Sequence, residues 1–321
     1  MIILTGGAGF IGSNFLKKLN DEGIDDIFIV DCLDCTEKWK NLVGKKFKDY
    51  LNKDNFFRSL SSSEFSEADA VFHFGACSST TELNGQFLIE NNYASSKQLL
   101  QWALKNDVRF IYASSAATYG DGSNGFSDDN SNTLRLQPLN IYGYSKQLFD
   151  AYLIKNKLYD QVTGLKFFNV FGPNEYHKDS MRSMIHKAFC QIRETGKINL
   201  FRSNDSAIKD GEQSRDFIYV KDCVKVVWWL FEKKKTGIFN VGSGQANSWL
   251  KLSRSIFHSL EKTENIEYID IPSNLIEQYQ NYTQADISKL LKAGYDQEFF
   301  TLEEAVEDYI RNYLLQKVQY N

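Results

Sequence analysis

The sequence predicts an α/β protein with a doubly wound parallel sheet and a smaller, mostly C-terminal α/β substrate domain. Apolar runs of strand length occur at 70–74, 109–113 and 163–168, and long amphipathic stretches of helical spacing separate them. This alternation is typical of βαβ winding around a parallel sheet. Another apolar run, 1–5, precedes a glycine-rich turn, and helical patterns continue beyond residue 249. We therefore expect one sheet-forming unit joined to a second lobe.

The glycine-rich turn has the spacing of a dinucleotide-binding loop. Gly6, Gly9 and Gly12 follow the first predicted strand, and a helical pattern follows them. Glycines at these points allow a tight turn and the close approach of backbone N–H groups to a pyrophosphate, which then faces the helix N-terminus. A second predicted strand, 26–30, is followed directly by Asp31. This order of strand, glycine turn, helix, strand and acid predicts a Rossmann-type domain.

The residues leave the cofactor preference open between NAD and NADP. Asp31 is placed to accept hydrogen bonds from the ribose hydroxyls of NAD. Lys38 and Lys53 belong to segments that can return toward the 2′-phosphate of NADP, which a lysine would bind. The same two lysines are equally compatible with solvated surface charge.

Tyr142 and Lys146 form the catalytic pair that the sequence predicts. They lie four residues apart in a segment of helical pattern, so both side chains share one helix face. A free tyrosine titrates near ~10, so it can act as a base at neutral pH only beside positive charge, which Lys146 supplies. Ser115 ends the strand at 109–113, where ligands bind in such sheets. We expect its hydroxyl to contact a substrate alcohol beside Tyr142.

Composition places the chain among compact enzymes. It has 321 residues, 42% of them hydrophobic and 24% charged, and a net charge of -4, which argues against a nucleic-acid partner. No apolar stretch reaches the ~20 residues of a membrane span, so a cytoplasmic location is expected. Cys32 and Cys35 form a CxxC pair without a second pair or suitably spaced histidines. No metal site is therefore predicted.

Domain boundaries follow from the same patterns. Residues 1–170 with about 215–247 are expected to form the dinucleotide-binding domain, and about 171–214 with 248–321 the substrate-binding domain. The stretch 123–133, rich in Ser, Asn, Asp and Gly, is expected to be a loop. The aromatic residues of the C-terminal lobe, except Tyr279, are expected in its core rather than in the site.

The glycine turn, the Ser115 segment and the Tyr142 and Lys146 pair together resemble the extended short-chain dehydrogenase/reductase family, whose members modify nucleotide-activated sugars. The segments 215–222 and 237–244 are similar to returning segments of that family. The resemblance implies that Arg215 binds the substrate's diphosphate. It also implies a homo-oligomer, since members of the family form pentamers.

Within this family the chain is similar to a branch that inverts C6 of an ADP-linked heptose for the lipopolysaccharide core. The similarity lies in 75–82, 168–173, 177–180 and 279–286. It implies a transient 6-ketone, tightly bound NADP and a second catalytic base, Lys178. The implied cofactor contacts are Gly6, Gly9, Phe10, Ile11, Gly12, Asp31, Cys32, Lys38, Lys53, Gly75, Ala76, Cys77, Ser78, Ser79, Asn92, Lys146, Val170 and Lys178. The implied substrate contacts are Ser79, Asn169, Ser180, Lys187, Phe201, Arg202, Ser203, Asn204, Arg215 and Tyr279.

Because the sequence departs from the branch's pattern at three points, it does not determine the nucleotide base of the substrate or the contacts to its diphosphate. Lys187 stands where a substrate-binding histidine is expected, 201–204 differs from the usual phosphate-facing segment, and 205–214 is long. A C4 epimerase of the same family is the alternative, since it would use Ser115 and Tyr142 unchanged. A non-catalytic cofactor-binding regulator is a weaker alternative, because the tyrosine and lysine pair is kept. A dehydratase is disfavoured, since alanines follow Ser115 where that reaction needs acids.

Overall fold

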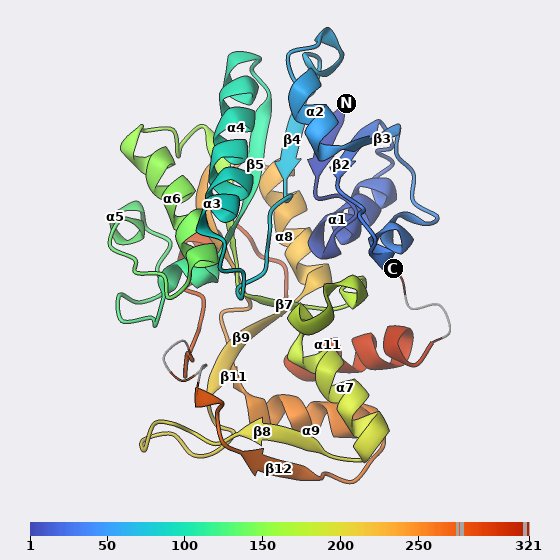
Figure 1. Cartoon of the computed structure of the whole chain (residues 1–321), viewed down its shortest axis with the longest axis vertical. Helices are drawn as coiled ribbons and strands as arrows, with labels where there is room; N and C mark the ends of the chain where they lie inside the picture. The colour runs from blue at the N-terminus through green and yellow to red at the C-terminus, as the bar shows by residue number, and fades with distance from the viewer. Residues whose placement is uncertain (274–275, 277–278, 317–319, 321) are drawn as a thin grey trace.

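A parallel sheet forms the centre of the larger half of the protein, as the computed structural model shows (Figure 1). The structure describes residues 1–273, 276, 279–316 and 320. Within this described part the main sheet has seven strands, and each pairs in parallel with its neighbours. In spatial order they are β10 (Gly237–Val241), β6 (Val162–Phe167), β5 (Arg109–Ser115), β4 (Ala70–His73), β1 (Ile2–Thr5), β2 (Ile27–Asp31) and β3 (Asp49–Asn52).

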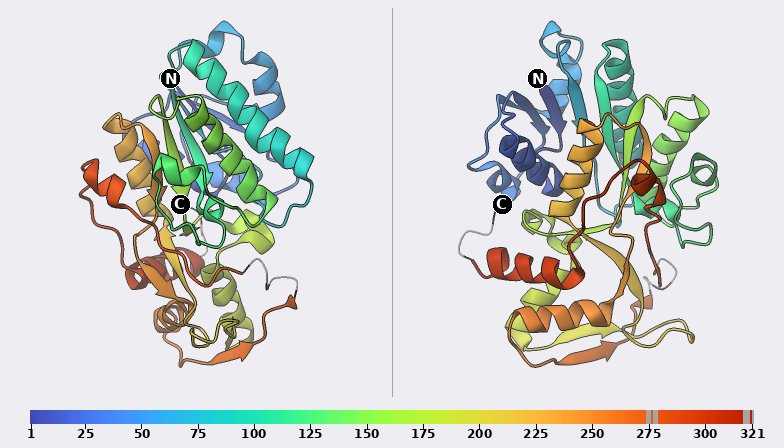
Figure 2. Two further views of the ribbon diagram at one scale, coloured as in Figure 1. Left: turned by 90° about the vertical axis from the view of Figure 1, so that its left-hand side faces the viewer. Right: turned by 180° about the vertical axis from the view of Figure 1, so that it is seen from behind.

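Helices cover both faces of this sheet, as the views from the side and from behind show (Figure 2). The helix α1 (Phe10–Asp21) packs beside α8 (Val220–Glu232) on one face. The other face carries α2 (Lys53–Ser59), α4 (Ser95–Lys105) and α6 (Ile141–Lys155). The remaining helical segments of this half are 3-10 helices η1 (Glu37–Leu42), η2 (Ser63–Phe65) and η4 (Ala116–Tyr119), the π-helix η3 (Ile89–Ala94), and short helices α3 (Gly85–Leu88), α5 (Asn130–Thr133) and α10 (Ser288–Lys292).

Burial on both faces explains why the strands are continuous apolar runs. In β1, Ile2 and Leu4 belong to the core under α1 and α8, whereas Ile3 belongs to the core under α2, α4 and α6. Successive side chains of a strand point to opposite faces, so a sheet covered on both faces favours apolar residues along the whole strand. The fold class predicted from the sequence is thereby confirmed.

A smaller half carries a separate core. Its helices are η5 (Tyr176–Met181), α7 (Met184–Thr195), α9 (Trp249–Ser259), α11 (Leu302–Tyr309) and the π-helix η7 (Ile310–Leu314). Its strands are β7 (Asn169–Phe171), β9 (Ser214–Tyr219) and β11 (Ala246–Ser248) in one sheet, and β8 (Ile198–Phe201) with β12 (Ile266–Ile269) in another. Phe189, Ile256 and Val306 are buried where α7, α9 and α11 meet. The predicted domain boundaries stay a prediction.

Local details differ from the expectations. The stretch 123–133 was expected to be a loop, yet its last residues form the single turn α5, which packs against α6. The helical segment that ends with α4 begins as the π-helix η3, and α11 continues into another π-helix, η7. Such widened turns depend on tertiary packing, which local pattern does not encode. In the described part of the chain, no helix combines the length and apolarity needed to cross a membrane.

A buried ion pair joins the central strands to α6. Asp150, on α6, accepts a hydrogen bond from Lys166 of β6 at 2.7 Å, and both side chains are completely buried. Tyr112 and Ser114 of β5 donate to the same carboxylate at 2.8 and 2.7 Å. Lys166 also donates to Thr118 at 2.8 Å. Charges out of water are tolerated only when they are paired and hydrogen-bonded in this way.

Removing one partner of this pair should therefore destabilise the fold strongly. We expect Lys166→Met to lower the free energy of unfolding by about 3–5 kcal/mol, because Asp150 stays buried without a counter-charge. Urea denaturation followed by circular dichroism measures this change. The matched control is Lys197→Met, which breaks a partly exposed pair with Glu267 and should cost less than about 1 kcal/mol. Equal losses in the two variants would contradict the role of the buried pair.

Candidate active site

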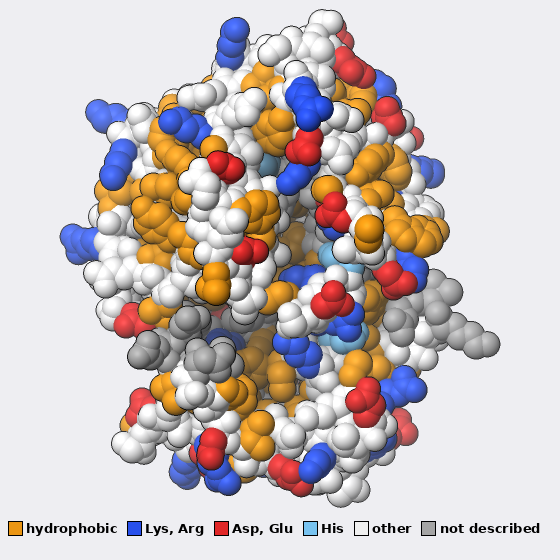
Figure 3. Space-filling model, viewed as in Figure 1, with side chains coloured by type: hydrophobic (Ala, Val, Ile, Leu, Met, Phe, Trp, Pro, Cys, Tyr) orange, Lys and Arg blue, Asp and Glu red, His pale blue; other side chains and the backbone are white. Residues whose placement is uncertain are grey.

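A cavity of about 690 Å³ lies where the carboxyl edge of the parallel sheet meets the smaller half. Figure 3 shows the surface hollowed between the two halves. Many of the predicted site residues line it together, although they come from distant parts of the sequence. Those residues are Phe10, Ile11, Ala76, Ser78, Ser115, Tyr142, Lys146, Asn169, Val170, Lys178, Lys187, Phe201 and Tyr279.

Tyr142 enters the cavity from the first turn of α6. Asn140 caps this helix, since its side chain accepts a hydrogen bond from the backbone N–H of Gly143 at 2.8 Å. Burial raises the pKa of the Tyr142 phenol, and a hydrogen bond with Ser115 partly opposes that rise. The Ser115 hydroxyl in turn accepts from the N–H of Ala117 at 3.1 Å. The phenol and the hydroxyl are thus held as a pair at the end of β5.

Lys146 lies one turn further along α6 and is almost completely buried. Its ammonium donates to the carbonyl of Ala113 at 2.9 Å. Burial lowers its pKa to about 8, and the negative charge of Asp150 limits the fall. Tyr142 and Lys146 both line the cavity. Below about pH 8 the pair therefore consists of a neutral phenol beside a charged ammonium.

Lys178 reaches the cavity from η5, in the other half of the protein. Its ammonium lies 5.4 Å from the ring centroid of Phe10, at the start of α1. Burial lowers the pKa of Lys178, the carboxylate of Glu175 opposes this, and Lys187 adds to the lowering. Glu175 is buried and accepts from the Ser183 hydroxyl at 2.7 Å. A lysine with a lowered pKa can exchange protons nearer to neutral pH than a free one.

The glycine turn is shaped by contacts that only glycine permits. Gly6 has φ +70°, and a Cβ there would lie 2.6 Å from the backbone nitrogen of Gly75. A Cβ on Gly12 would lie 2.1 Å from the carbonyl oxygen of Gly6. Gly9 is the N-cap of α1. Only glycine therefore fits at Gly6 and Gly12, and the turn is as tight as the spacing predicts.

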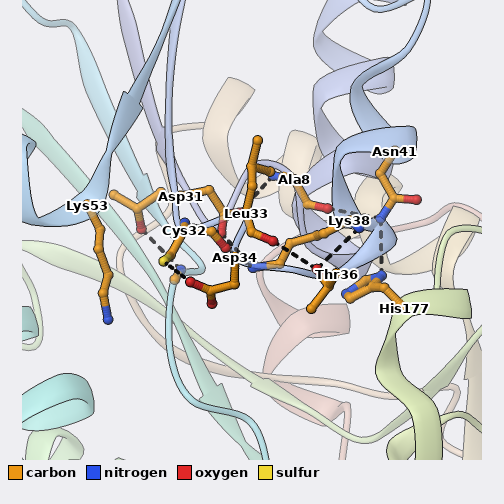
Figure 4. Close-up of polar contacts among 12 residues, drawn as sticks. Ala8, Asp31, Cys32, Leu33, Asp34, Thr36, Lys38, Asn41, Lys53 and His177 are labelled. Carbon is orange, nitrogen blue, oxygen red and sulfur yellow. Dashed lines mark hydrogen bonds and ion pairs between the residues drawn. The ribbon is translucent and has the colours of Figure 1, made fainter.

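The acid and the lysines that bear on cofactor choice lie together (Figure 4). Asp31 accepts from the backbone N–H groups of Ala8 and Cys32 at 2.9 and 2.7 Å. Lys38 forms an ion pair with Asp31 at 2.8 Å and donates to the Cys32 carbonyl at 2.7 Å. Lys53 donates to the side chain of Asn91 at 2.8 Å. Both lysines are therefore beside the cofactor end of β2 rather than turned to bulk solvent.

Asn92 holds the loop 75–79 in place by hydrogen bonds. Its amide donates to the Cys77 carbonyl and to the Ser145 hydroxyl at 3.0 Å each, and its oxygen accepts from the Cys77 N–H at 2.8 Å. Ser145 donates to the carbonyl of Tyr142 at 2.7 Å. Gly75, Cys77 and Ser79 belong to this loop but do not line the cavity. Asn92 thus connects the loop to the start of α6.

The predicted substrate residues divide into two groups. Tyr279 and Phe201 line the cavity with their rings 6.0 Å apart. Arg215 is buried behind Tyr279, 5.4 Å from its ring, and burial lowers its pKa to about 10. Arg202 instead pairs with Asp210 at 3.2 Å. The predicted substrate contacts that do not line the cavity are Ser79, Ser180, Arg202, Ser203, Asn204 and Arg215.

Some cavity residues were missed by the sequence reasoning. Trp249 was expected in the core because it opens an amphipathic helical pattern, yet it lines the cavity, 5.7 Å from Arg215. Trp249 also packs against the core of the smaller half, as expected, but helical spacing does not show that this residue borders a cavity as well. Glu175, which does not line the cavity but acts on the pKa of Lys178, belongs to no sequence motif that would have marked it as part of the site. Among the described residues, no group of three or more His, Cys, Asp and Glu is arranged to hold a metal ion.

The glycine turn, the acid after β2 and the Ser115, Tyr142 and Lys146 cluster at the sheet edge define a dinucleotide-dependent enzyme of the extended short-chain dehydrogenase/reductase type. The chain belongs to the NAD dependent epimerase/dehydratase family, whose profile matches residues 2–242.

Relatives at 46–51% identity over nearly their whole length carry the same activity in their names. The chain is 51% identical over 316 residues to an ADP-L-glycero-D-manno-heptose-6-epimerase of Nitratidesulfovibrio vulgaris, covering 98% of each protein. It is 46% identical over 331 residues to one from Fusobacterium nucleatum, covering 100% of each. The structure is similar to that of Helicobacter pylori ADP-L-glycero-D-manno-heptose-6-epimerase, with a TM-score of 0.79, 28% identity, and coverage of 97% of this chain and 95% of that one.

The lowered pKa of Lys146 predicts a pH-dependent stability. Between about pH 8 and 10.5 the unfolded chain binds a proton on Lys146 that the folded protein has released. The contribution of this group to the free energy of unfolding therefore rises with pH in that window. Lys146→Met should stabilise the protein at pH 7 by about 1–3 kcal/mol, with the gain shrinking toward pH 10. Urea titrations at the two pH values measure it, with Lys197→Met as control, and a pH-independent gain would contradict it.

Proposed function

We propose that this protein epimerises C6 of the heptose in ADP-D-glycero-D-manno-heptose, giving ADP-L-glycero-D-manno-heptose for the lipopolysaccharide core. The observation that carries the proposal is the meeting of two proton-transfer groups in one cavity: Tyr142 from α6 and Lys178 from η5. The 51% identity to an ADP-L-glycero-D-manno-heptose-6-epimerase over nearly the whole of both chains supports the same activity.

Two bases suit inversion at C6 because this carbon lies outside the sugar ring. Oxidation leaves a planar ketone, and rotation about the C5–C6 bond presents its opposite face. The oxygen at C6 then occupies a different place in the cavity and needs a second proton partner there. A bound nicotinamide would take up the C6 hydride and return it, so the reaction has no net redox change.

Each residue has one part in this scheme. Tyr142 exchanges the proton of the C6 hydroxyl in one orientation, and Ser115 holds that hydroxyl by a hydrogen bond. Lys146 stabilises the phenolate of Tyr142 by its charge. Lys178 exchanges the proton in the other orientation, which its burial favours by lowering its pKa. Asn169, on β7 in the cavity wall, contacts the sugar.

The nucleotide end of the substrate is proposed to lie toward the smaller half. Phe201, Tyr279 and Trp249 offer aromatic surface there, and Lys187 offers positive charge to a phosphate. Arg215, fixed behind Tyr279, supports this wall of the cavity. The outlying predicted substrate contacts, Ser79, Ser180, Arg202, Ser203 and Asn204, remain proposals that the family resemblance alone supports. A cytoplasmic homo-oligomer is proposed on that same basis.

NADP is the proposed cofactor, with NAD as the alternative. Lys38 places positive charge on Asp31, and Lys53 follows Asn52, the partner of Asp31 in the neighbouring strand, so both are proposed to meet a 2′-phosphate. Asp31 is already neutralised by Lys38 at 2.8 Å, which reduces its repulsion of a phosphate. The glycine turn, Phe10 and Ile11 are proposed to hold the pyrophosphate, and Ala76, Ser78 and Val170 the nicotinamide half.

Removing either base should abolish epimerisation. We expect Tyr142→Phe and Lys178→Met each to lower kcat by about 10²–10⁴-fold, because each removes a proton-transfer group. The assay incubates the purified protein and NADP with ADP-D-glycero-D-manno-heptose and follows the C6 proton by NMR. Tyr144→Phe, an exposed neighbour on α6, is the matched control and should stay within about twofold of the wild type. Absence of conversion by the wild type with cofactor bound would overturn the assignment, and C4 epimerisation of other nucleotide sugars would be tested next.

Removing Lys38 should change the cofactor preference. Lys38→Ala deletes a charged donor for the 2′-phosphate and leaves Asp31 without its counter-charge, so NADP should bind about 10–100-fold more weakly. The affinity for NAD should change much less. Calorimetric titration with both dinucleotides measures the ratio. Lys40→Ala, which removes a partly exposed lysine of the same 3-10 helix that pairs with Glu37, should leave the ratio unchanged. An equal loss for NAD and NADP would contradict 2′-phosphate recognition by Lys38.

A further inference from the structure

Asn41 is a buried polar residue at the junction of the cofactor region and the Lys178 segment. It lies on η1, the same 3-10 helix that carries Lys38, and only 1% of it is exposed. Sequence reasoning gave it no role. A buried amide is stable only when it is hydrogen-bonded, so its partners show what it holds together.

The partners of Asn41 come from two other segments. Its amide nitrogen donates to the carbonyl of Ala8 in the glycine turn at 2.9 Å and to the carbonyl of Asn174 at 3.1 Å. The same nitrogen lies 3.3 Å from Nδ1 of His177, the residue before Lys178 (Figure 4). Burial lowers the pKa of His177 to about 4, so its ring is neutral near pH 7 and Nδ1 can share one of the two amide hydrogens with a carbonyl.

The segment that carries Lys178 needs such support because its backbone is unfavourable. Asn174 has φ +76° and Asp179 has φ +45°, so non-glycine residues on both sides of Lys178 adopt left-handed values. Such conformations cost of order 1–3 kcal/mol each and persist only where surrounding contacts impose them. Asn14 of α1 donates to the carbonyl of Pro173 at 2.9 Å, which fixes the start of the same segment.

We infer that Asn41 is a positioning residue for Lys178, which it ties to the glycine turn and to the helix of Lys38. The inference rests on the proposed function, in which Lys178 is a catalytic base. Ala8 connects the two sides directly, because its carbonyl accepts from Asn41 while its N–H donates to Asp31. The groups proposed to bind the cofactor phosphates and the group proposed to move the substrate proton thus share one set of hydrogen bonds.

This arrangement has a consequence for catalysis. A base acts only within hydrogen-bond reach of its proton, and small misplacements reduce rates strongly. Loss of the Asn41 amide should let residues 174–181 depart from their strained backbone, while the glycine turn keeps its own glycine-dependent shape. The rate of the proton-transfer step should then fall although substrate and cofactor still bind.

The test compares Asn41→Ala with Asn20→Ala. Asn20 is a matched control, because its amide also bridges two backbone carbonyls, those of Ile24 and Lys46 at 3.0 and 2.8 Å, away from the cavity. Amide hydrogen exchange of the full chain with saturating NADP is read for residues 174–181 and for residues 6–14. We expect Asn41→Ala to speed exchange at 174–181 about tenfold or more and to leave 6–14 near the wild type. Asn20→Ala should change neither.

A kinetic measurement separates positioning from general loosening. Asn41→Ala should lower kcat for epimerisation at least about tenfold with KM and NADP affinity nearly unchanged. His177→Leu, which removes a partly exposed partner of Asn41, should speed exchange at 174–181 in the same direction and serves if Asn41→Ala does not fold. Unchanged exchange at 174–181 in these variants, or an unchanged kcat, would overturn the inference. An inactive wild type would overturn the proposed function instead, and the exchange data would still decide whether Asn41 fixes the segment.

Discussion

A buried carboxylate, Asp150, holds the elements on which the active site is built. It joins β5 through Tyr112 and Ser114 and β6 through Lys166, while its own helix, α6, carries Tyr142 and Lys146. Because this charge is out of water, any shift of α6 along the sheet would leave it unpaired at high cost. The helix therefore has one stable register against the strands. That register puts the phenol of Tyr142 at the edge of the sheet where β5 ends with Ser115.

A second constraint fixes the opposite wall of the cavity. The glycine turn approaches the backbone of Gly75 so closely that no side chain fits at Gly6. The turn also accepts the amide of Asn41, which reaches across to the segment before Lys178. Lys178 is thus attached to the cofactor-binding half, although it follows β7 and belongs to the wall of the smaller half. Hydrogen bonds as well as packed apolar side chains hold the walls of the cavity together.

Burial also sets the acid–base properties of the cavity. Burial lowers the pKa values of Lys146 and Lys178. The negative charge of Asp150 limits the fall for Lys146, and that of Glu175 limits it for Lys178. The charge of a buried carboxylate thus acts on each lysine. The same low-dielectric surroundings that make these charges costly make their effect on a phenolate or a substrate alkoxide large. A site of this kind is less stable than an apolar core would be, which is common where chemistry is performed.

The sequence by itself determined the features that depend on neighbours along the chain. Continuous apolar runs predicted strands covered on both faces, and the glycine spacing predicted the tight turn. The interval of four residues between Tyr142 and Lys146 predicted that they share one helix face. Only the tertiary structure brought Lys178 and Trp249 into the cavity, left Arg202 outside its lining, and joined Asn41 to His177. The physical reason is that periodicity and turn chemistry act over a few residues. Contacts between distant segments depend instead on how whole elements pack, which no local pattern specifies.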